Sequence, residues 1–357
     1  MKISQKLDRA ETYIPEQANC DIYLTANESF VVPDEILEKA IKDAIEEASQ
    51  NLNRYPDAFS VGLCQAFADY YGIDWRLVSA ANGSDESILM LYACLLDAGD
   101  KVLTLDRDFS MYRITGNTQN QQIIALKKDE DSQSVAIETI VKTAKEEDVS
   151  MIIFSNPCNP TGQIFAREEI ITLVESFDGV VVVDEAYMDF ADESVIDLAG
   201  GKYENLVVLR TASKAFALAG VRIGMQVASL DITRRLQAGK LVFNVSIFGQ
   251  KIGEAIYRHK ASYQKAIAEI KESTAFLYEH LVQLSQKYPR LKKIYQTHAN
   301  FIFMRAENAS GIFQSLKAKG VMTRDFGVDY FRVCAGTREE NLAFLKALEE
   351  ILQEERV

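Results

Sequence analysis

The sequence predicts an α/β fold, with a mostly parallel central sheet in a large domain and a smaller α+β domain. Between residues 101 and 209, short β-branched runs alternate with helical patterns, which is typical of a parallel sheet buried on both faces. The length of 357 residues exceeds that of an average domain, which favours a second domain. The pattern changes near residue 230, where a long helix precedes mixed strands and helices.

We expect three segments along the chain. Residues 1–33 are irregular and are interpreted as an N-terminal arm, which packs with the smaller domain or crosses to another subunit. Residues 34–235 are predicted to form the large α/β domain, and residues 236–357 the small C-terminal α+β domain. No Pro/Gly-rich linker marks the boundary between the two domains.

The individual elements follow from local patterns. Apolar residues at helical spacing predict a helix over residues 34–47, a second that ends near Gly72, and a third over 87–96. The four predicted strands of the central sheet span 101–105, 151–154, 180–183 and 206–209. For the smaller domain, we expect helices over 263–288, 312–319 and 341–353, and strands over 301–304 and 331–334.

The composition argues against several function classes. A formal net charge of −13 disfavours nucleic-acid binding, which needs a basic face. The sequence has no apolar run long enough to span a membrane and no signal-peptide pattern, so we expect no membrane partner. The five scattered cysteines suit reduced thiols in a cytoplasm, and three histidines without a ligand motif predict no metal site.

The carboxyl end of the predicted strand 206–209 carries the strongest chemical signal. Thr211 and Ser213 follow this strand, Lys214 comes next, and Arg222 lies eight residues after Lys214. Open α/β sheets bind ligands at this end of their strands. Considered alone, Lys214 would be interpreted as a solvent-exposed lysine on a helix. At the ligand-binding edge of a sheet, however, a lysine can be partly desolvated, which frees its amine to act as a nucleophile.

A phosphate site is predicted where Asn82-Gly83-Ser84-Asp85-Glu86 precedes an apolar helix. The first backbone N–H groups of a helix have no partner within it, and they point at the positive end of the helix dipole. Taken alone, the segment is better explained as an ordinary helix cap.

Two further polar groups follow neighbouring strands. Asn159 begins the second of two Asn-Pro pairs in residues 156–162, and Asp184 follows four valines, with Tyr187 three residues later. An isolated buried carboxylate is costly, so Asp184 needs a partner or caps the next helix. An apolar run ending in Asp-Glu also occurs in P-loop NTPases, but the chain lacks the Gly-x-x-x-x-Gly-Lys-Ser/Thr motif. It equally lacks the Gly-x-Gly-x-x-Gly motif of dinucleotide sites.

Together, these sites match one cofactor, pyridoxal phosphate. Its phosphate, ring nitrogen, phenolic oxygen and aldehyde would each find a partner. Residues 83–85, Ser213 and Arg222 would hold the phosphate, and Asp184 would pair with the ring nitrogen. Asn159 and Tyr187 would hold the phenolic oxygen, and Lys214 would react with the aldehyde.

On these residues, the chain resembles the fold-type-I pyridoxal-phosphate aminotransferases of the class I/II superfamily, whose fold is aspartate aminotransferase-like. Within them, it is most similar to the histidinol-phosphate aminotransferases. The resemblance spans nearly the whole chain, in family order. The matching segments are residues 24–28, 54–56, 82–86, 156–162, 183–187, 210–224 and 332–341.

The resemblance implies a role for each cofactor residue. Lys214 would be the catalytic residue, which binds the cofactor aldehyde and then moves a proton between the substrate Cα and the cofactor C4′. Asp184 would keep the ring nitrogen protonated, and Phe109 would stack on the ring, where tyrosine is usual. Tyr187 and Asn159 would bind the phenolic oxygen. The implied phosphate ligands are Ser84, Asp85, Thr211, Ser213 and Arg222.

The same resemblance implies a homodimer, in which Tyr55 reaches the cofactor phosphate of the neighbouring subunit. Arg332 would bind the substrate carboxylate, Arg324 and Tyr13 would help to bind a substrate phosphate, and Asn27 would lie near the substrate. A locally packed turn residue remains the alternative for Tyr55, and a surface arginine for Arg324.

The predicted function is transfer of an amino group between histidinol phosphate and 2-oxoglutarate, in histidine biosynthesis. The alternatives are an aminotransferase for aromatic or other amino acids, and an enzyme like threonine-phosphate decarboxylase. Three departures from the family bear on this choice of donor. Residues 29–33 lack the usual Asn-Pro-x-Gly-Pro, Arg107-Asp108 replaces a customary Pro-Thr, and the chain is short between Phe326 and Phe331.

Overall fold

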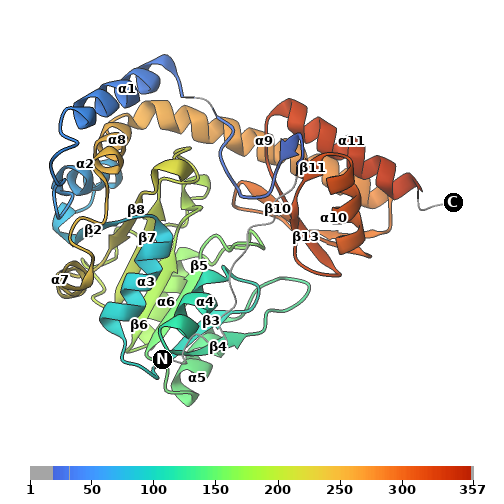
Figure 1. Ribbon diagram of the computed structural model, residues 1–357. Coiled ribbons are helices and arrows are strands. Elements are labelled where there is room, and N and C mark those ends of the chain that lie inside the picture. Colours follow the sequence, from blue (N-terminus) through green and yellow to red (C-terminus); the bar gives the residue numbers. More distant parts are fainter. Residues whose placement is uncertain (1–18, 32, 355–357) are drawn as a thin grey trace, which may run out of the picture.

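The protein has a large body and a small body, which one long helix joins (Figure 1). The computed structural model describes residues 19–31 and 33–354. The large body holds a seven-stranded sheet, and the small body holds a four-stranded sheet. The joining helix, α9 (Lys260–Lys287), runs from one body to the other.

The large sheet confirms the predicted mostly parallel arrangement. Its strand order is β2-β8-β7-β6-β5-β3-β4. The strands are β2 (Val78–Ala81), β3 (Lys101–Leu105), β4 (Gln122–Leu126), β5 (Met151–Ser155), β6 (Val180–Asp184), β7 (Leu206–Thr211) and β8 (Gly224–Val227). Only β8 is antiparallel to its neighbours, β2 and β7. Residues 212–223 join β7 to β8 through the 3₁₀ turn η4 (Ala219–Val221), without the crossover helix that a parallel pair needs.

Helices cover both faces of the large sheet (Figure 1). Successive side chains along a strand point to opposite faces of the sheet, and each face has its own apolar core. On β6, for example, Val181 and Val183 belong to one core and Val182 belongs to the other. One core includes residues of α3 (Ser84–Leu95), α4 (Met111–Thr118) and α7 (Leu230–Gly239), and the other includes residues of α5 (Ile137–Glu146) and α6 (Arg167–Ser176).

Three helices form a group beside the sheet. They are α1 (Glu35–Ser49), α2 (Val61–Tyr71) and α8 (Ile247–Tyr257), and α8 packs against both of the others. The predicted domain boundary between residues 235 and 236 falls within α7, which packs against α3. We therefore propose that the boundary lies at residue 259, immediately before α9.

The small body surrounds its sheet with α10 (Ala309–Ala318) and α11 (Arg338–Glu354). Its strands lie in the order β12-β13-β10-β9. They are β9 (Leu291–Ile294), β10 (Phe301–Ala306), β12 (Arg324–Asp325) and β13 (Tyr330–Cys334). A separate two-stranded sheet pairs β1 (Ile22–Tyr23) with β11 (Val321–Met322) in parallel.

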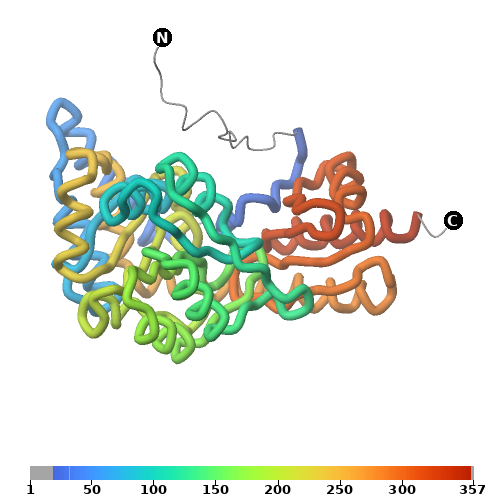
Figure 2. Tube along the Cα trace, turned by 90° about the horizontal axis from the view of Figure 1, so that it is seen from below, coloured from blue at the N-terminus to red at the C-terminus, as the bar shows by residue number. Residues whose placement is uncertain are grey.

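The segment after residue 19 therefore belongs to the small body, on which it lies in Figure 2. Leu24 extends this pairing, because its N–H donates to Met322 and its carbonyl accepts from the N–H of Cys334. The chain then crosses to the large body, where α1 begins.

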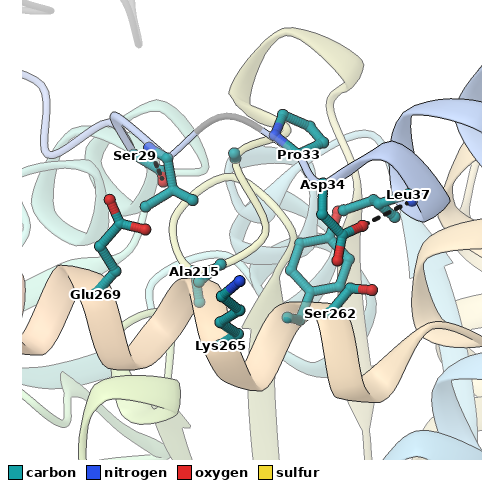
Figure 3. A pocket seen from close by; sticks show the side chains of 12 residues that line it. Ser29, Pro33, Asp34, Leu37, Ala215, Ser262, Lys265 and Glu269 are labelled. Carbon is teal, nitrogen blue, oxygen red and sulfur yellow. Dashed lines mark hydrogen bonds between the residues drawn. The ribbon is translucent and has the colours of Figure 1, made fainter.

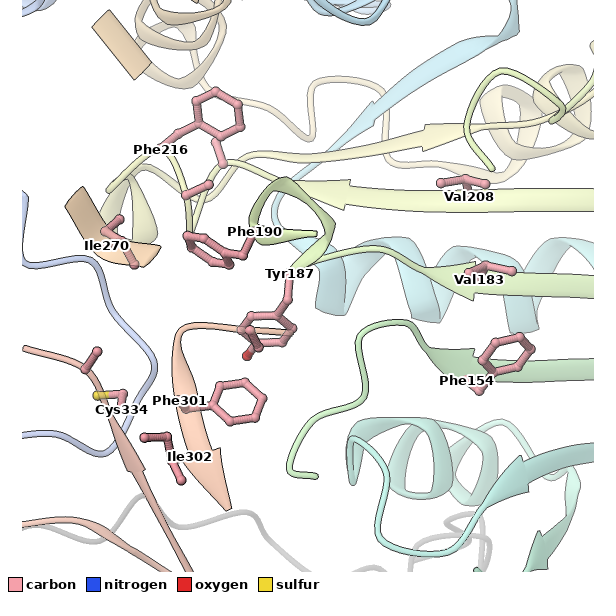
Figure 4. Packing of buried hydrophobic residues seen from close by; sticks show 14 of the residues in the cluster. Phe154, Val183, Tyr187, Phe190, Val208, Phe216, Ile270, Phe301, Ile302 and Cys334 are labelled. Atoms are coloured by element: carbon pink, nitrogen blue, oxygen red, sulfur yellow. The ribbon is translucent and has the colours of Figure 1, made fainter. Parts of the chain in front are cut away.

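The apolar core is continuous between the two bodies (Figure 4). The ring of Tyr187, from the large body, meets the ring of Phe301, from β10, edge to face at 5.1 Å between centroids. The sequence-predicted strands and helices are all present, with ends shifted by at most a few residues. The described elements without a sequence prediction include β2, β4 and β8, which are short or partly exposed.

Candidate active site

The candidate site lies where the carboxyl ends of β5, β6 and β7 meet the first turn of α3 (Figure 1). Register places the last residues of these strands side by side, with Ser155 opposite Asp184 and Asp184 opposite Leu209. The turns that follow carry Asn159, Tyr187 and Lys214. The parallel sheet thus gathers residues that are far apart in the sequence.

Asp184 is buried at the end of β6, with 3% of its surface exposed. Its carboxylate accepts a hydrogen bond from the Tyr112 hydroxyl at 2.8 Å and another from the N–H of Ala186 at 3.1 Å. Burial nevertheless raises the pKa of Asp184 to about 7. Such a carboxylate is well placed to pair with a cation that enters the site, because the pair recovers the cost of burying the charge.

The first turn of α3 forms a cradle suited to an anion. Gly83 precedes the helix with a φ of 82°, and its backbone lies so close to Gly224 that a Cβ on Gly224 would overlap it. The Ser84 hydroxyl is buried and has no hydrogen-bond partner among the described residues. A buried hydroxyl without a partner is costly, so a ligand oxygen at this helix start would satisfy it.

The opposite wall of this cradle comes from the β7–β8 connection. The Thr211 and Ser213 hydroxyls are hydrogen-bonded to each other at 2.9 Å. Arg222 adopts a φ of 58°, and its guanidinium lies 3.3 Å from the Asp85 carboxylate. A Cβ on Gly83 would overlap that guanidinium, so only glycine leaves room for it there. The structure thus brings together four of the five predicted phosphate ligands, and Asp85 joins them through Arg222.

Lys214 reaches the segment that crosses between the bodies. Its ammonium donates to the Ala26 carbonyl at 2.8 Å and lies 5.9 Å from the centroid of the Tyr187 ring. The neighbouring Asn27 has a φ of 55° and donates from its amide to the Tyr187 hydroxyl at 2.9 Å. The predicted substrate residue Asn27 therefore touches a predicted cofactor residue directly.

Arg332 projects from β13 toward the large body. Its guanidinium donates to the Asn159 side-chain carbonyl and to the Thr25 carbonyl, the latter at 2.6 Å. Its Cζ lies 5.0 Å from the centroid of the Phe301 ring. Arg324 of β12 is directly opposite Arg332 in the antiparallel pair, so the two side chains share one face of the sheet.

The remaining predicted residues lie at different places. Phe109 contacts the Tyr112 ring edge to face, with 5.6 Å between the centroids. Tyr55 is 80% exposed and stacks on Phe243, at 4.4 Å, rather than on the site of its own chain. Tyr13 lies outside the described residues.

Sequence reasoning missed a buried cluster beneath the site. The Lys128 ammonium, in a residue only 3% exposed, lies 2.9 Å from the Cys158 sulfur and donates to the Arg107 carbonyl at 3.2 Å. Asp108 accepts from the hydroxyl and the N–H of Ser155. These contacts tie the loop that carries Phe109 to the loop that carries Asn159. The sequence around Lys128 is typical of an exposed charged turn, so the burial of Lys128 could not be predicted from it.

A second missed group is the ion-pair network behind Lys214. Arg210 is 3% exposed and pairs with Glu185 at 2.7 Å and with Asp189 at 3.1 Å. Its guanidinium also lies 4.7 Å from the centroid of the Tyr71 ring, whose hydroxyl donates to Asp189. The only sign of this network in the sequence is that Arg210 stands near the end of an otherwise apolar strand.

A cavity of about 100 Å³ lies on the outer side of the Lys214 turn (Figure 3). It is lined by Ala215 and Ala217, by α9 side chains that include Lys265 and Glu269, and by Ser29, Val31, Pro33 and Asp34. Neither Lys214 nor Asp184 lines it, so it is separate from the candidate site.

Among the helices of the described residues, none has the length and apolar character needed to cross a membrane. Those residues also contain no group of three or more His, Cys, Asp or Glu side chains arranged to hold a metal ion.

The fold and the site together define a transferase of the aspartate aminotransferase-like class, and comparison with known proteins gives the family. The model for "Aminotransferase class I and II" matches residues 21–348. The chain therefore belongs to the class I and II aminotransferase family and is an enzyme.

Its relatives include histidinol-phosphate aminotransferases. It is 33% identical over 353 residues to that of Clostridium kluyveri, covering 98% of both chains. It is 36% identical over 332 residues to that of Clostridium novyi, covering 92% of this chain and 90% of the relative.

Solved structures agree on the fold. The histidinol-phosphate aminotransferase of Sinorhizobium meliloti, in complex with pyridoxal-5′-phosphate, superposes with a TM-score of 0.84 at 20% identity. That match covers 94% of this chain and 91% of the other. The aspartate aminotransferase of Thermus thermophilus with maleate gives a TM-score of 0.81 at 18% identity, covering 99% of both chains.

Proposed function

We propose that this aminotransferase carries pyridoxal phosphate and transfers the amino group of histidinol phosphate to 2-oxoglutarate, in cytoplasmic histidine biosynthesis. One observation carries the cofactor assignment: a buried carboxylate, a lysine and an anion cradle meet at the same sheet edge. Asp184, Lys214 and the buried Ser84 hydroxyl supply these three features.

The residues present fit the cofactor. The helix start at Ser84, with Thr211, Ser213 and Arg222, would hold the phosphate, and Asp184 would hold the proton of the ring nitrogen. When bound, pyridoxal phosphate supplies an electron sink for the pair released at the donor Cα.

The protein's own part of the reaction falls to a few side chains. The Lys214 amine takes the proton from the donor Cα and later returns one, as a general acid and base. Tyr187, whose hydroxyl accepts from the Asn27 amide at 2.9 Å, would orient the cofactor ring through its phenolic oxygen. Phe109 would stack on the face of the cofactor ring and exclude water from it.

Two arginines on one face of the small sheet favour a donor with a strong anionic group. Arg324 and Arg332 are directly opposite each other, so an anion bound at that face would meet two positive charges. A phosphate ester is such an anion. This fits the substrate in the names of the relatives that share about a third of the sequence.

We also propose a homodimer in which Tyr55 reaches the partner's cofactor. Tyr55 lies in an exposed apolar patch, which we call the Tyr55 patch and which comprises Leu52, Tyr55, Phe59, Leu241, Val242 and Phe243. An exposed apolar patch of this kind marks an interaction surface.

A donor comparison tests the substrate assignment. Purified enzyme with 2-oxoglutarate is given histidinol phosphate, phenylalanine or threonine phosphate, and glutamate formation is measured. We expect the highest kcat/KM with histidinol phosphate. Rapid turnover of another donor without turnover of histidinol phosphate would overturn the substrate proposal and leave the family unchanged.

A further inference from the structure

We propose that Arg107 is a specificity-determining residue, whose guanidinium binds an anionic group of the substrate, a phosphate or a side-chain carboxylate. The inference rests on the proposed function, because it extends the same substrate site. Arg107 lies in the loop between β3 and α4, two residues before Phe109.

The Arg107 guanidinium has unused binding capacity. Its Cζ lies 4.9 Å from the centroid of the Tyr330 ring, and its Nε lies 3.8 Å from the Asp106 carboxylate. Its N–H groups donate no hydrogen bond within the part of the chain that the structure describes. Only 18% of the side chain is exposed, so water reaches it poorly. A shielded guanidinium with free donors suits an acceptor that arrives with the ligand.

Its place relative to the small sheet points to the substrate. Tyr330 and Arg332 are two residues apart on β13, so their side chains share one face. Arg324 shares that face, because it is directly opposite Arg332. Arg107 thus comes from the large body and stacks on the same face that carries the two predicted substrate arginines.

The backbone holds Arg107 in this position. Its φ of 51° lies in the left-handed region, which residues other than glycine seldom adopt. Such a backbone conformation persists only where the surrounding structure imposes it. The Arg107 carbonyl accepts from the buried Lys128 ammonium at 3.2 Å and from the Cys158 thiol at 3.6 Å. The guanidinium is therefore directed at the small sheet before any ligand binds, which reduces the entropy lost on binding.

The ligand chemistry that fits is an oxyanion. A guanidinium fork matches a phosphate or a carboxylate in a two-point contact. Under the proposed function, this group is the phosphate of histidinol phosphate, carried on the carbon next to the amine-bearing Cα, or the side-chain carboxylate of glutamate, carried on the other branch from Cα. The two donor pairs of the test distinguish these two sources.

The test is the variant Arg107→Gln, assayed with matched donor pairs. Histidinol phosphate is compared with histidinol, and glutamate with glutamine, by the KM of each amino-donor half-reaction. We expect the KM for at least one anionic member to rise about tenfold to a hundredfold, as loss of a charge-assisted contact implies. The KM for its neutral counterpart should change less than about twofold. Arg107→Lys should retain part of the affinity.

Two measurements separate binding from other effects. Lys142→Gln, which removes an equal charge from the exposed face of α5, controls for net charge and should change neither KM. The visible absorbance of the bound cofactor should be unaltered in Arg107→Gln, because Phe109 keeps its place.

The outcomes distinguish the two proposals. Equal effects on charged and neutral donors, or no effect on either anionic donor, would overturn the role of Arg107. Wild-type enzyme that fails to use histidinol phosphate would overturn the substrate proposal, while the glutamate and glutamine pair would still decide the role of Arg107.

Discussion

At the scale of single residues, the site combines a carboxylate that is unfavourably buried with a lysine that donates to a neutral backbone carbonyl. Asp184 has two hydrogen bonds, yet burial raises its pKa to about 7. Lys214 donates to a backbone carbonyl, and no carboxylate contacts its ammonium in the described part of the chain. Both groups are thus prepared for a ligand that supplies a cation to one and an aldehyde to the other.

Lys214→Ala should bind pyridoxal phosphate and lose turnover. The phosphate ligands and Asp184 are untouched in this variant, so cofactor should remain after gel filtration. The rate should fall at least about 10²–10⁴-fold, the usual contribution of a general acid–base group. Steady-state assays with histidinol phosphate measure this fall, and turnover at the wild-type rate would refute the assignment of the base.

Asp184→Asn should change how the stability of the cofactor-free protein depends on pH. The folded pKa of about 7 exceeds the ordinary value of 3.8, so the folded state holds the proton more tightly. Asp184 therefore stabilises the fold below about pH 4 relative to neutral pH, and that contribution is lost as the pH rises through 7. The total change is at most about 4 kcal/mol.

Urea unfolding of the cofactor-free wild type and variant between pH 4 and 8 measures this difference. The variant should gain stability relative to the wild type as the pH rises. A difference that is independent of pH would contradict the raised pKa. The variant should also bind pyridoxal phosphate more weakly, because its amide cannot pair with a protonated ring nitrogen.

Sequence reasoning located residues whose neighbours along the chain form a motif, and it missed those whose partners are distant. Lys214 and Asp184 follow apolar strands, so their positions could be predicted from local pattern. Tyr112 contacts Asp184 across 72 residues, and Lys128 contacts Cys158 across 30. Only the order of strands in the sheet brings those pairs together, and no local pattern encodes that order.

At the scale of elements, the first turn of α3 depends on two glycines. A Cβ on Gly224 would overlap the backbone of Gly83, and a Cβ on Gly83 would overlap the Arg222 guanidinium. This close packing places the helix start beside Arg222 and creates the cradle. The sequence predicted the cradle from Gly83 and Ser84, but the antiparallel return of β8, which supplies Gly224, was not predicted.

Gly83→Ala should weaken cofactor binding more than it weakens the fold. The added Cβ would push aside the Arg222 guanidinium, and the φ of 82° would strain the new residue by about 1 kcal/mol. Gly72→Ala is a matched control, because Gly72 has a φ of 72° with no atom within 4 Å of an added Cβ. Both variants should lose similar stability in urea unfolding, and only Gly83→Ala should raise the Kd for pyridoxal phosphate. Equal Kd values in the two variants would contradict the cradle.

At the scale of the whole molecule, the two bodies share one apolar core and one site. Residues 24–27 cross between them, and Arg332 contacts both Asn159 of the large body and Thr25 of the crossing segment. The site therefore requires the two bodies to be docked together. The two-part architecture could be predicted from the change in pattern along the chain, whereas its boundary could not, because α7 and α8 continue the packing of the large body.

Val242→Asp should weaken the proposed dimer. Val242 is 61% exposed in the Tyr55 patch, and a charge buried there on association would be unpaired. Ile36→Asp, at a position 64% exposed on α1, is the control. Sedimentation velocity should detect monomers for Val242→Asp at concentrations where the wild type and the control are dimers. An unchanged dimer in all three would place the interface elsewhere.

The central claim is that this enzyme exchanges an amino group with histidinol phosphate through a cofactor bound at Lys214. The most direct measurement is the visible spectrum of the purified, cofactor-loaded enzyme as substrates are added one at a time. We expect histidinol phosphate alone to abolish the absorbance of the bound aldehyde form, and subsequent 2-oxoglutarate to restore it. A spectrum that histidinol phosphate leaves unchanged, in enzyme that borohydride labels at Lys214, would contradict the claim.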